Sequence, residues 1–387
     1  MKNIVFYDLE TTGRSSHWDQ IIQIAAIHTD SNFKVLDKIN LTGKLNSYCI
    51  PDPEALLVNN IPIENIYSSN LTNYSLIREV YEKFKSWSPA TFIGYNSINF
   101  DEEVLRNSLF RNLFDPYLTI KANNTRSDLL NSTRISNYLY PEKIKSVISE
   151  KGTSILKLES IANVNGIKGF TAHDALGDTY ATLELAKMIK DKTPEIWEKS
   201  TKNIAKENLE NDIMTNPFCY LESFFGKTKL FCLSYIGKHP FYKWALCFDL
   251  SEDPERSLAM GDKEFINFLE KSPKVIRNIK LNKSPILLDV KTCFNDNKYE
   301  KISSDVIFNR HRFIKESAKF KERILSYYSN VINENNFSQT EVFAEESIYK
   351  KFINNHDSLL LKNFQKSTWE NRIKIINDFK DDRLRYF

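Results

Sequence analysis

The stretch FYDLETTG, at residues 6–13, decides the fold of the first half of this chain. It continues the apolar run at 3–5, and residues 3–8 together predict a buried strand. Asp8 and Glu10 are two residues apart, so on a strand their carboxylates point to the same face. Neighbouring charges at the end of an apolar strand are costly unless a cation compensates them, and oxygen-only ligands suit Mg²⁺ or Mn²⁺. The alternative is two solvated acids at an ordinary strand end, which the following Thr-Thr-Gly turn makes less attractive.

Around this strand, strand-like and helical patterns alternate. Strand-like runs lie at 21–30, 34–43 and 90–96, helical periods lie at 75–87, 101–114, 156–166 and 172–190, and the tract 44–74 is irregular. Strands that come first and then alternate with helices predict an α/β domain of about 190 residues.

The pattern changes after a helical segment at 197–212. Short β-like runs with polar breaks then predict a small, mainly β domain, and helical patterns return from residue 309. We therefore expect three domains, at 1–193, 194–302 and 303–387.

Composition limits the class of protein. The 387 residues are 41% hydrophobic, with only 10 Gly and 12 Pro, which excludes a disordered or fibrous chain. A net charge of +3 is a weak signal, since a nucleic-acid binder needs only a local basic stripe. Five scattered cysteines without a CxxC pair disfavour structural zinc and disulfides. With no leader peptide and no apolar run of ~18 residues, a soluble, cytoplasmic protein is expected.

A second candidate acid follows in GYNSINFDEEVL, at 94–105. A strand ends there, the chain turns through Asn96, and Asp101 opens a helix. Taken alone, Asp101 is more simply interpreted as a helix N-cap.

The third candidate motif is AHDALGDTYAT, at 172–182. His173 and Asp178 lie five residues apart on a predicted helix, close enough in rotation to approach one cleft, while Asp174 is expected to be solvated. Histidine can act as a base near neutral pH. Taken alone, His173 is more simply a surface histidine or a satisfied core histidine.

The three motifs occur in order, and together they resemble the Asp-Glu-Asp-Asp exonuclease superfamily, in the branch whose fifth residue is histidine. The branch with tyrosine does not fit, because Tyr180 follows Asp178. Within the histidine branch the chain most resembles bacterial exodeoxyribonuclease I. The resemblance is carried by residues 23–33, 94–117, 125–131 and 165–187, and more weakly by LNKSP at 281–285 and NRHRF at 309–313.

The resemblance implies an RNase H-like exonuclease domain, a small SH3-like β domain and a C-terminal helical region. The family's helical region is longer, so 303–387 is expected to be incomplete. The implied activity is 3'→5' hydrolysis of single-stranded DNA to nucleoside 5'-monophosphates, in DNA repair and recombination. Two Mg²⁺ ions, replaceable by Mn²⁺, are implied, and His173 is the implied general base. The implied metal ligands are Asp8, Glu10, Asp101 and Asp178.

Substrate contacts are expected at Thr11 and Asn96, in the turns beside the acids. Phosphate contacts are expected from arginines placed on helices beside the site, at Arg106, Arg111, Arg126 and Arg134. A charged, solvated helix face is the alternative. Lys227 and Lys229 are interleaved with Phe224, Phe225 and Phe231, as in surfaces that bind single strands, although core aromatics in a hairpin are the simpler interpretation.

The implied partners are single-stranded DNA and the acidic C-terminal tail of the single-stranded DNA-binding protein. We expect a monomer without membrane contact. Three alternatives stay open: an exoribonuclease or oligoribonuclease of the same branch, a proofreading subunit, and a catalytically weak single-strand-binding protein.

Overall fold

A five-stranded sheet forms the centre of the first domain. The computed structural model describes residues 2–59, 61–202, 206–224, 226–334 and 342–387, without the side chains of 206–208 and 332–334. The strand order is β3-β2-β1-β4-β5. The strands are β1 (Asn3–Thr11), β2 (Ile21–Thr29), β3 (Val35–Thr42), β4 (Ala90–Gly94) and β5 (Thr125–Asp128). Since β1 and β4 are parallel, their carboxyl ends lie at the same edge of the sheet.

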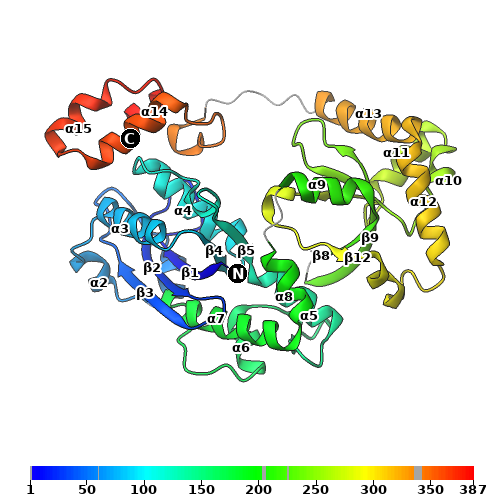
Figure 1. The fold of residues 1–387 in the computed structure, drawn as a ribbon, viewed down its shortest axis with the longest axis horizontal. Coiled ribbons are helices and arrows are strands. Elements are labelled where there is room, and N and C mark those ends of the chain that lie inside the picture. The colour runs from blue at the N-terminus through cyan, green and yellow to red at the C-terminus, as the bar shows by residue number, and fades with distance from the viewer. Residues whose placement is uncertain (1, 60, 203–205, 225, 335–341) are drawn as a thin grey trace.

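Successive side chains of β1 point into two apolar layers, one on each face of the sheet. Val5, Tyr7 and Leu9 pack against α3 (Asn73–Ser86) and α4 (Asp101–Arg111). Ile4 and Phe6 face the layer formed by α5 (Leu129–Leu139), α6 (Leu158–Val164) and α7 (Ala175–Lys192). Figure 1 shows the two helix layers on either side of the sheet. Because side chains alternate along a strand, Asp8 and Glu10 share the face of Phe6 and point toward α7.

Several short elements were not expected from the sequence. The tract 44–74 contains α1 (Pro53–Asn59) and α2 (Ile63–Ser68). Short 3₁₀ helices are η1 (Ser97–Asn99) and η2 (Leu118–Ile120), and β6 (Val147–Ile148) pairs with β7 (Ser154–Ile155). Strand β5 also escaped the periodicity analysis, because it is only four residues long and mostly polar.

The second domain is a five-stranded antiparallel sheet in the order β11-β10-β9-β8-β12. Helices α8 (Pro194–Thr201) and α9 (Lys206–Thr215) lead into it. The strands are β8 (Phe218–Phe224), β9 (Lys227–Lys238), β10 (Ala245–Asp249), β11 (Ile276–Ile279) and β12 (Leu288–Asp289). Between them lie α10 (Pro254–Leu258), α11 (Asp262–Glu270) and η3 (Leu281–Lys283), and η4 (Val290–Asn295) follows β12. This arrangement confirms the predicted small, mainly β domain.

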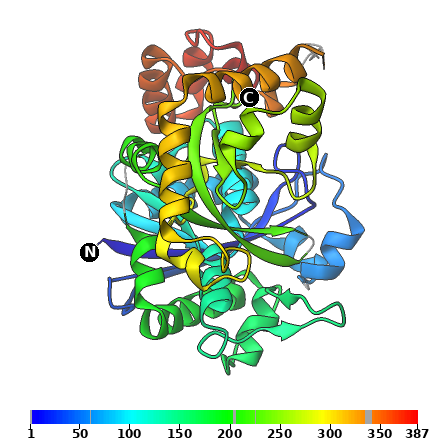
Figure 2. The ribbon, with the colours of Figure 1, turned by 90° about the vertical axis from the view of Figure 1, so that its right-hand side faces the viewer.

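The helical region divides between the two domains. Helices α12 (Ser304–Glu316) and α13 (Ala318–Glu334) pack on the second sheet and share its core through Ile307, Ile314 and Phe320 (Figure 2). The predicted boundary between 302 and 303 therefore separates residues of one core. An amphipathic pattern indicates that a helix has an apolar face, but not which sheet covers that face.

The last helices lie on the first domain. A core cluster joins Phe110 and Leu113, at the end of α4, to Leu361, Phe364 and Leu384. The helices concerned are α14 (Asn355–Lys366), α15 (Trp369–Ile376) and α16 (Asp382–Tyr386), after the short η5 (Ala344–Glu346). Figure 1 shows them in red above α4. Among the described helices, none has the length and apolar character needed to cross a bilayer.

Candidate active site

Three carboxylates from two elements meet at the carboxyl end of β1. Oxygens of Asp8, Glu10 and Asp178 all lie within 4.8 Å of one another. Asp178 comes from the first turn of α7, the helix that covers the even-numbered face of β1. The strand period thus places Asp8 and Glu10 on one face, and α7 brings Asp178 to them, so three of the four acids expected as ligands lie together.

Asp101 lies near this group without belonging to it: the repulsion of its carboxylate is among the causes that raise the pKa of Asp8. Asp101 is the first residue of α4 and is only 6% exposed. Its Oδ1 accepts a hydrogen bond from the backbone N–H of Leu9, at 3.2 Å. Phe100, not Asp101, occupies the N-cap position of α4. The Asp101 carboxylate is therefore directed at β1, so a cap alone does not explain it.

The turn that presents Asp101 is tightly built. A Cβ atom at Gly94 would lie 2.5 Å from Cβ of Ser97 and 3.0 Å from the carbonyl oxygen of Tyr7, so only glycine fits. Asn96 follows with φ of 59°, in the left-handed region where asparagine is comparatively well tolerated. These two positions explain why the chain turns sharply between β4 and α4.

Asp128 holds the same turn and was not singled out by the sequence analysis. Its Oδ1 accepts from the backbone N–H of Asn96 at 2.8 Å, and its Oδ2 from that of Ile98 at 3.3 Å. It also caps α5 by accepting from the N–H of Leu130. An aspartate just before a helical run was the available signal, but nothing local indicates that it reaches back to another turn.

His173 lies beside the acids, although not on the helix where it was expected. Helix α7 begins at Ala175, and His173 precedes it, exposed, with φ of 60°. The backbone N–H of His173 donates to Oδ2 of Asp178 at 3.2 Å. His173 therefore orients one of the acids through its backbone and leaves its imidazole ring at the surface of the site.

The expectation that Asp174 is solvated was wrong. It is the N-cap of α7 and accepts from the N–H of Gly177 at 2.9 Å. Its other oxygen accepts from the side-chain amide of Gln23, also at 2.9 Å. This cap starts the helix after His173, which is the physical reason why His173 was misplaced on a helix.

The acid group is electrostatically unfavourable without a cation. Burial, with added repulsion from Asp101, Glu10 and Asp178, raises the pKa of Asp8 well above its ordinary range. Burial is also the main cause that raises the pKa of Glu10 to about 9, that of Asp101 to about 7 and that of Asp178 to about 6. A group of oxygen donors that resist ionisation together fits one or more hard divalent cations, whose charge removes the penalty.

Of the predicted substrate-contacting residues, Asn96 and Arg134 lie next to open space. Asn96 is exposed in the turn before Asp101. Arg134 lines a cavity of about 320 Å³ between the two sheet domains. Other lining residues of this cavity are Asn99, Asn131, Glu222, Phe224 and Lys280. Thr11 is buried, and its hydroxyl donates to the carbonyl of Gly13 at 2.6 Å, which stabilises the turn after Glu10.

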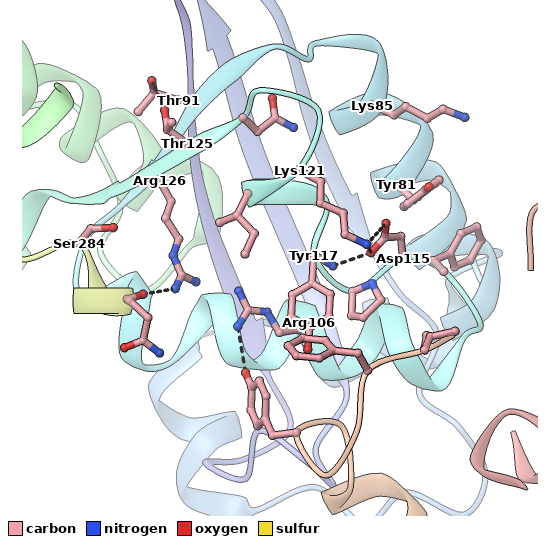
Figure 3. Close-up of a pocket in the computed structure, with 18 of the residues that line it drawn as sticks. Tyr81, Lys85, Thr91, Arg106, Asp115, Tyr117, Lys121, Thr125, Arg126 and Ser284 are labelled. Atoms are coloured by element: carbon pink, nitrogen blue, oxygen red, sulfur yellow. Dashed lines mark hydrogen bonds and ion pairs between the residues drawn. The ribbon is translucent and has the colours of Figure 1, made fainter. Parts of the chain in front are cut away.

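Arg106 and Arg126 belong to a buried ion network. Oε1 of Glu102 accepts from Nη2 of Arg106 at 2.7 Å, from Nη1 of Arg126 at 2.8 Å and from the hydroxyl of Thr119 at 2.6 Å. The Tyr7 hydroxyl donates to Oε2 of Glu102 at 3.1 Å. Figure 3 shows both arginines from the side of a larger cavity of about 1060 Å³. Their contacts favour a structural role, and their predicted phosphate contact stays a prediction.

Four basic residues also differ from or extend the expectation. Arg126 lies on β5 and not on a helix. Arg111 donates to the carbonyl of Asp19 at 2.7 Å. Lys227 and Lys229 are exposed on β9, while Phe231 is a buried core residue, as the simpler interpretation had it. Phe225 lies outside the described residues.

Replacing Glu102 by alanine is expected to lower the free energy of unfolding of the first domain by about 3–5 kcal/mol, because two buried guanidinium groups lose their carboxylate. Urea unfolding followed by circular dichroism measures this change. Glu184→Ala is the control: its pair with Lys187 is exposed, so a loss below ~1 kcal/mol is expected. Equal, small losses in both variants would show that the network contributes little.

A second group, of sulfur atoms, lies in the second domain. Cys219, Cys232 and Cys293 bring their Sγ atoms within 4.8 Å of one another, although they are far apart in the sequence. Cys219 and Cys232 face each other on β8 and β9. All three are fully buried in the largest apolar core, which is a common environment for unpaired cysteine.

Comparisons with known proteins agree with this site. Residues 5–186 match the family described as Exonuclease. Exodeoxyribonuclease I of Buchnera aphidicola subsp. Schizaphis graminum is 30% identical over 402 aligned positions, which cover 99% of this chain and 81% of that protein. For the enzyme of Buchnera aphidicola subsp. Acyrthosiphon pisum, the identity is also 30% and the coverage 99% and 94%.

Solved structures share the fold over nearly the whole chain. Escherichia coli exonuclease I in complex with a dA16 oligonucleotide has a TM-score of 0.83 at 23% identity, covering 100% of this chain and 85% of that one. A complex described as SSB/Exonuclease I with the inhibitor CFAM has a TM-score of 0.81 at 23% identity, covering 100% and 84%. A zinc-bound E. coli ExoI–ssDNA complex has a TM-score of 0.80 at 23% identity, covering 97% and 82%.

The fold, the acid group and the match over residues 5–186 together define the class of protein as an exonuclease. The 30% identity to two exodeoxyribonuclease I proteins, over 99% of this chain, narrows the assignment from exonucleases in general to one family. The chain belongs to the exodeoxyribonuclease I family, and its activity is that of a 3'→5' exodeoxyribonuclease.

Proposed function

We propose that this protein degrades single-stranded DNA from the 3' end to nucleoside 5'-monophosphates, in DNA repair and recombination. The observation that carries the proposal is the meeting of Asp8, Glu10 and Asp178, with Asp101 and His173 beside them, in a chain of the exodeoxyribonuclease I family. The oligonucleotide complex of E. coli exonuclease I, which shares the fold, supports the choice of a single-stranded substrate.

The four acids are the proposed ligands of two Mg²⁺ ions, for which Mn²⁺ can substitute. Asp8 would be shared between them, Glu10 and Asp178 would complete one site, and Asp101 would belong to the other. When bound, two such ions supply an activated water and charge stabilisation for the leaving 3'-oxygen. His173 would take a proton from the attacking water as general base, and its side chain is exposed beside the acids. The backbone N–H of the same residue keeps Asp178 in place.

The strand is proposed to approach through the cavity between the two sheet domains. Arg134 and Lys280 offer positive charge there, and the exposed edge of Phe224 offers a stacking surface. Thr11 and Asn96 would contact the terminal nucleotide from the turns beside the acids. Lys227 lies exposed on β9, next to Phe224 in the β8–β9 hairpin, so it is the proposed next phosphate contact along the strand.

The remaining expectations are proposals of the same kind. The domains are proposed at 1–193, 194–302 and 303–387, with α12 and α13 packed on the second domain. The structure described as SSB/Exonuclease I supports the single-stranded DNA-binding protein as a partner, and its acidic C-terminal tail is the proposed contact. We propose a cytoplasmic monomer.

A gel assay tests the proposal directly. The substrates are 5'-labelled single-stranded DNA, double-stranded DNA and RNA, each with Mg²⁺ or with EDTA. Stepwise shortening of single-stranded DNA from its 3' end, lost in EDTA, is the expected result. Preference for RNA would move the protein to the exoribonuclease relatives, and failure to cleave any substrate would favour a binding protein.

Divalent cations are expected to raise the melting temperature more at about pH 8.5 than at about pH 6. Without a cation, the pKa is about 9 for Glu10 and about 7 for Asp101, both above the ordinary values. The folded state then keeps protons that the unfolded state releases above about pH 4–5. The contribution of these groups to stability is therefore complete below that pH and is lost as the pH rises through 7 and 9.

A bound cation keeps the carboxylates ionised and removes this loss. Differential scanning fluorimetry with Mg²⁺ or EDTA, without DNA, measures the difference between the two melting temperatures from about pH 6 to about pH 9. A difference that stays constant or shrinks as the pH rises would show that these acids do not hold the ion.

A further inference from the structure

The first turn of α4 is a point where all three parts of the chain meet. Lys283, in the 281–285 loop of the second domain, donates from Nζ to the carbonyl oxygen of Ile98 at 3.0 Å. The same ammonium donates to Oε1 of Glu103 at 2.6 Å. Ile98 precedes Asp101 and Glu103 follows it. One lysine of the second domain therefore contacts a residue on each side of Asp101 in the sequence.

The C-terminal region also contacts Glu103, through Tyr349. The hydroxyl of Tyr349 donates to Oε2 of Glu103, and it accepts from Nη1 of Arg106 at 3.0 Å. Glu103 thus uses one oxygen for the second domain and the other for the C-terminal region. Figure 3 shows Arg106 with its bond to this tyrosine and Arg126 with its bond toward the 281–285 loop.

A third contact ties the same loop to the network behind Asp101. Nη2 of Arg126 donates to the carbonyl oxygen of Asn282 at 2.7 Å, while its Nη1 holds Glu102. Asp101, Glu102 and Glu103 are consecutive, so the loop 281–285 is linked to both residues that follow Asp101. Each link is a charge-assisted hydrogen bond, which is stronger and more directional than a neutral one.

The ion pair of Lys283 with Glu103 is largely buried, so it fixes the relative position of the two side chains more firmly than an exposed ion pair would. The side chain of Lys283 is 26% exposed and that of Glu103 16%. By contrast, the ion pair of Lys199 with Asp289, between α8 and β12, is 35% and 76% exposed, at 3.2 Å. Solvent screening weakens the second pair much more than the first.

We propose that Lys283 is a positioning residue for Asp101: by bridging Ile98 and Glu103 it makes the docked second domain part of the metal-site geometry, with Tyr349 as the corresponding contact from the C-terminal region. This rests on the proposed function of Asp101 as a metal ligand. Residues that hold a metal ligand in place typically change metal affinity or activity by about 10–100-fold when removed, and misplacement of a reacting group by 1 Å has a comparable effect.

The test compares Lys283→Met, which keeps the apolar stem, with Lys283→Arg and with Lys199→Met as a control for loss of an ion pair elsewhere in the chain. Three quantities are measured on the full chain. They are Mn²⁺ affinity by electron paramagnetic resonance, affinity for single-stranded DNA in EDTA, and the cleavage rate at saturating DNA.

For Lys283→Met we expect Mn²⁺ affinity and the cleavage rate at saturating DNA to fall by about 10-fold or more, with DNA affinity within about twofold of the original protein. Lys283→Arg should recover most of both losses, since it supplies donors of the same charge. Lys199→Met should behave like the original protein.

Three outcomes would overturn the proposal. Unchanged Mn²⁺ affinity and rate in Lys283→Met would remove the positioning role. A loss confined to DNA affinity would make Lys283 a substrate contact, and equal losses in Lys199→Met would indicate general domain loosening. If the original protein failed to cleave DNA, the proposed function would fail, while Mn²⁺ affinity would still report on Lys283.

Discussion

Asp8→Ala is expected to reduce turnover by on the order of 10³-fold or more, because Asp8 is the proposed bridge between two ions. Its carboxylate lies within 4.8 Å of Glu10 and Asp178, and Asp101 is among the main causes of its raised pKa. The rate of release of 5'-monophosphates from labelled single-stranded DNA, at saturating Mg²⁺, measures the loss.

The same variant should be at least as stable as the original protein when no metal is present. The raised pKa of Asp8 means that burial and the neighbouring acids penalise its ionised form in the folded state. Removing the side chain removes that penalty, so the melting temperature in EDTA at about pH 8 should stay equal or rise. An exposed acid on α7 gives the control: Glu184→Ala should change neither rate nor stability noticeably. Normal turnover in Asp8→Ala would falsify the site.

The parts of the fold that the sequence revealed are those with a strong local signal. β1 is mostly apolar until Asp8, and α7 is a long run of mostly helix-forming residues without proline, so both elements and the acids on them were predictable. The same holds for Asp101, because a strand, a turn and a helix start are each visible in GYNSINFDEEVL.

What the sequence could not reveal depends on partners far along the chain. Asp128 reaches back to the turn at Asn96, and Arg126 reaches Glu102 across 24 residues. Lys283 meets Glu103 across 180 residues. The sequence around an arginine looks the same whether the guanidinium group binds a phosphate or a buried carboxylate. The sequence analysis therefore expected phosphate contacts from Arg106 and Arg126 and could not identify Glu102 as their partner.

His173 was placed by its spacing to Asp178, and its real position changes how its role should be tested. It lies in a turn with φ of 60°, and its backbone N–H bonds Asp178. A variant that cannot tolerate this backbone conformation would disturb an acid as well as remove the imidazole. Asparagine and glycine adopt positive φ more readily than other residues, so both keep the turn while removing the base.

His173→Asn is therefore expected to lower the cleavage rate at saturating DNA and Mg²⁺ by about 10²–10⁴-fold, the usual contribution of general base catalysis. Mn²⁺ affinity and DNA affinity should stay within about twofold, since the backbone bond to Asp178 is kept. The pH–rate profile should also lose the acidic limb that titration of a catalytic base produces.

The His173→Gly variant tests the role of the imidazole ring separately from that of the backbone N–H. The side chain is exposed, so free imidazole in solution can reach the space that it leaves. If His173 acts as the base, millimolar imidazole should restore part of the rate in His173→Gly and none in Asp8→Ala, which lacks a ligand and not a base. A rate in His173→Asn within tenfold of the original protein, or no rescue of the glycine variant, would place the base elsewhere and leave His173 the backbone role toward Asp178 alone.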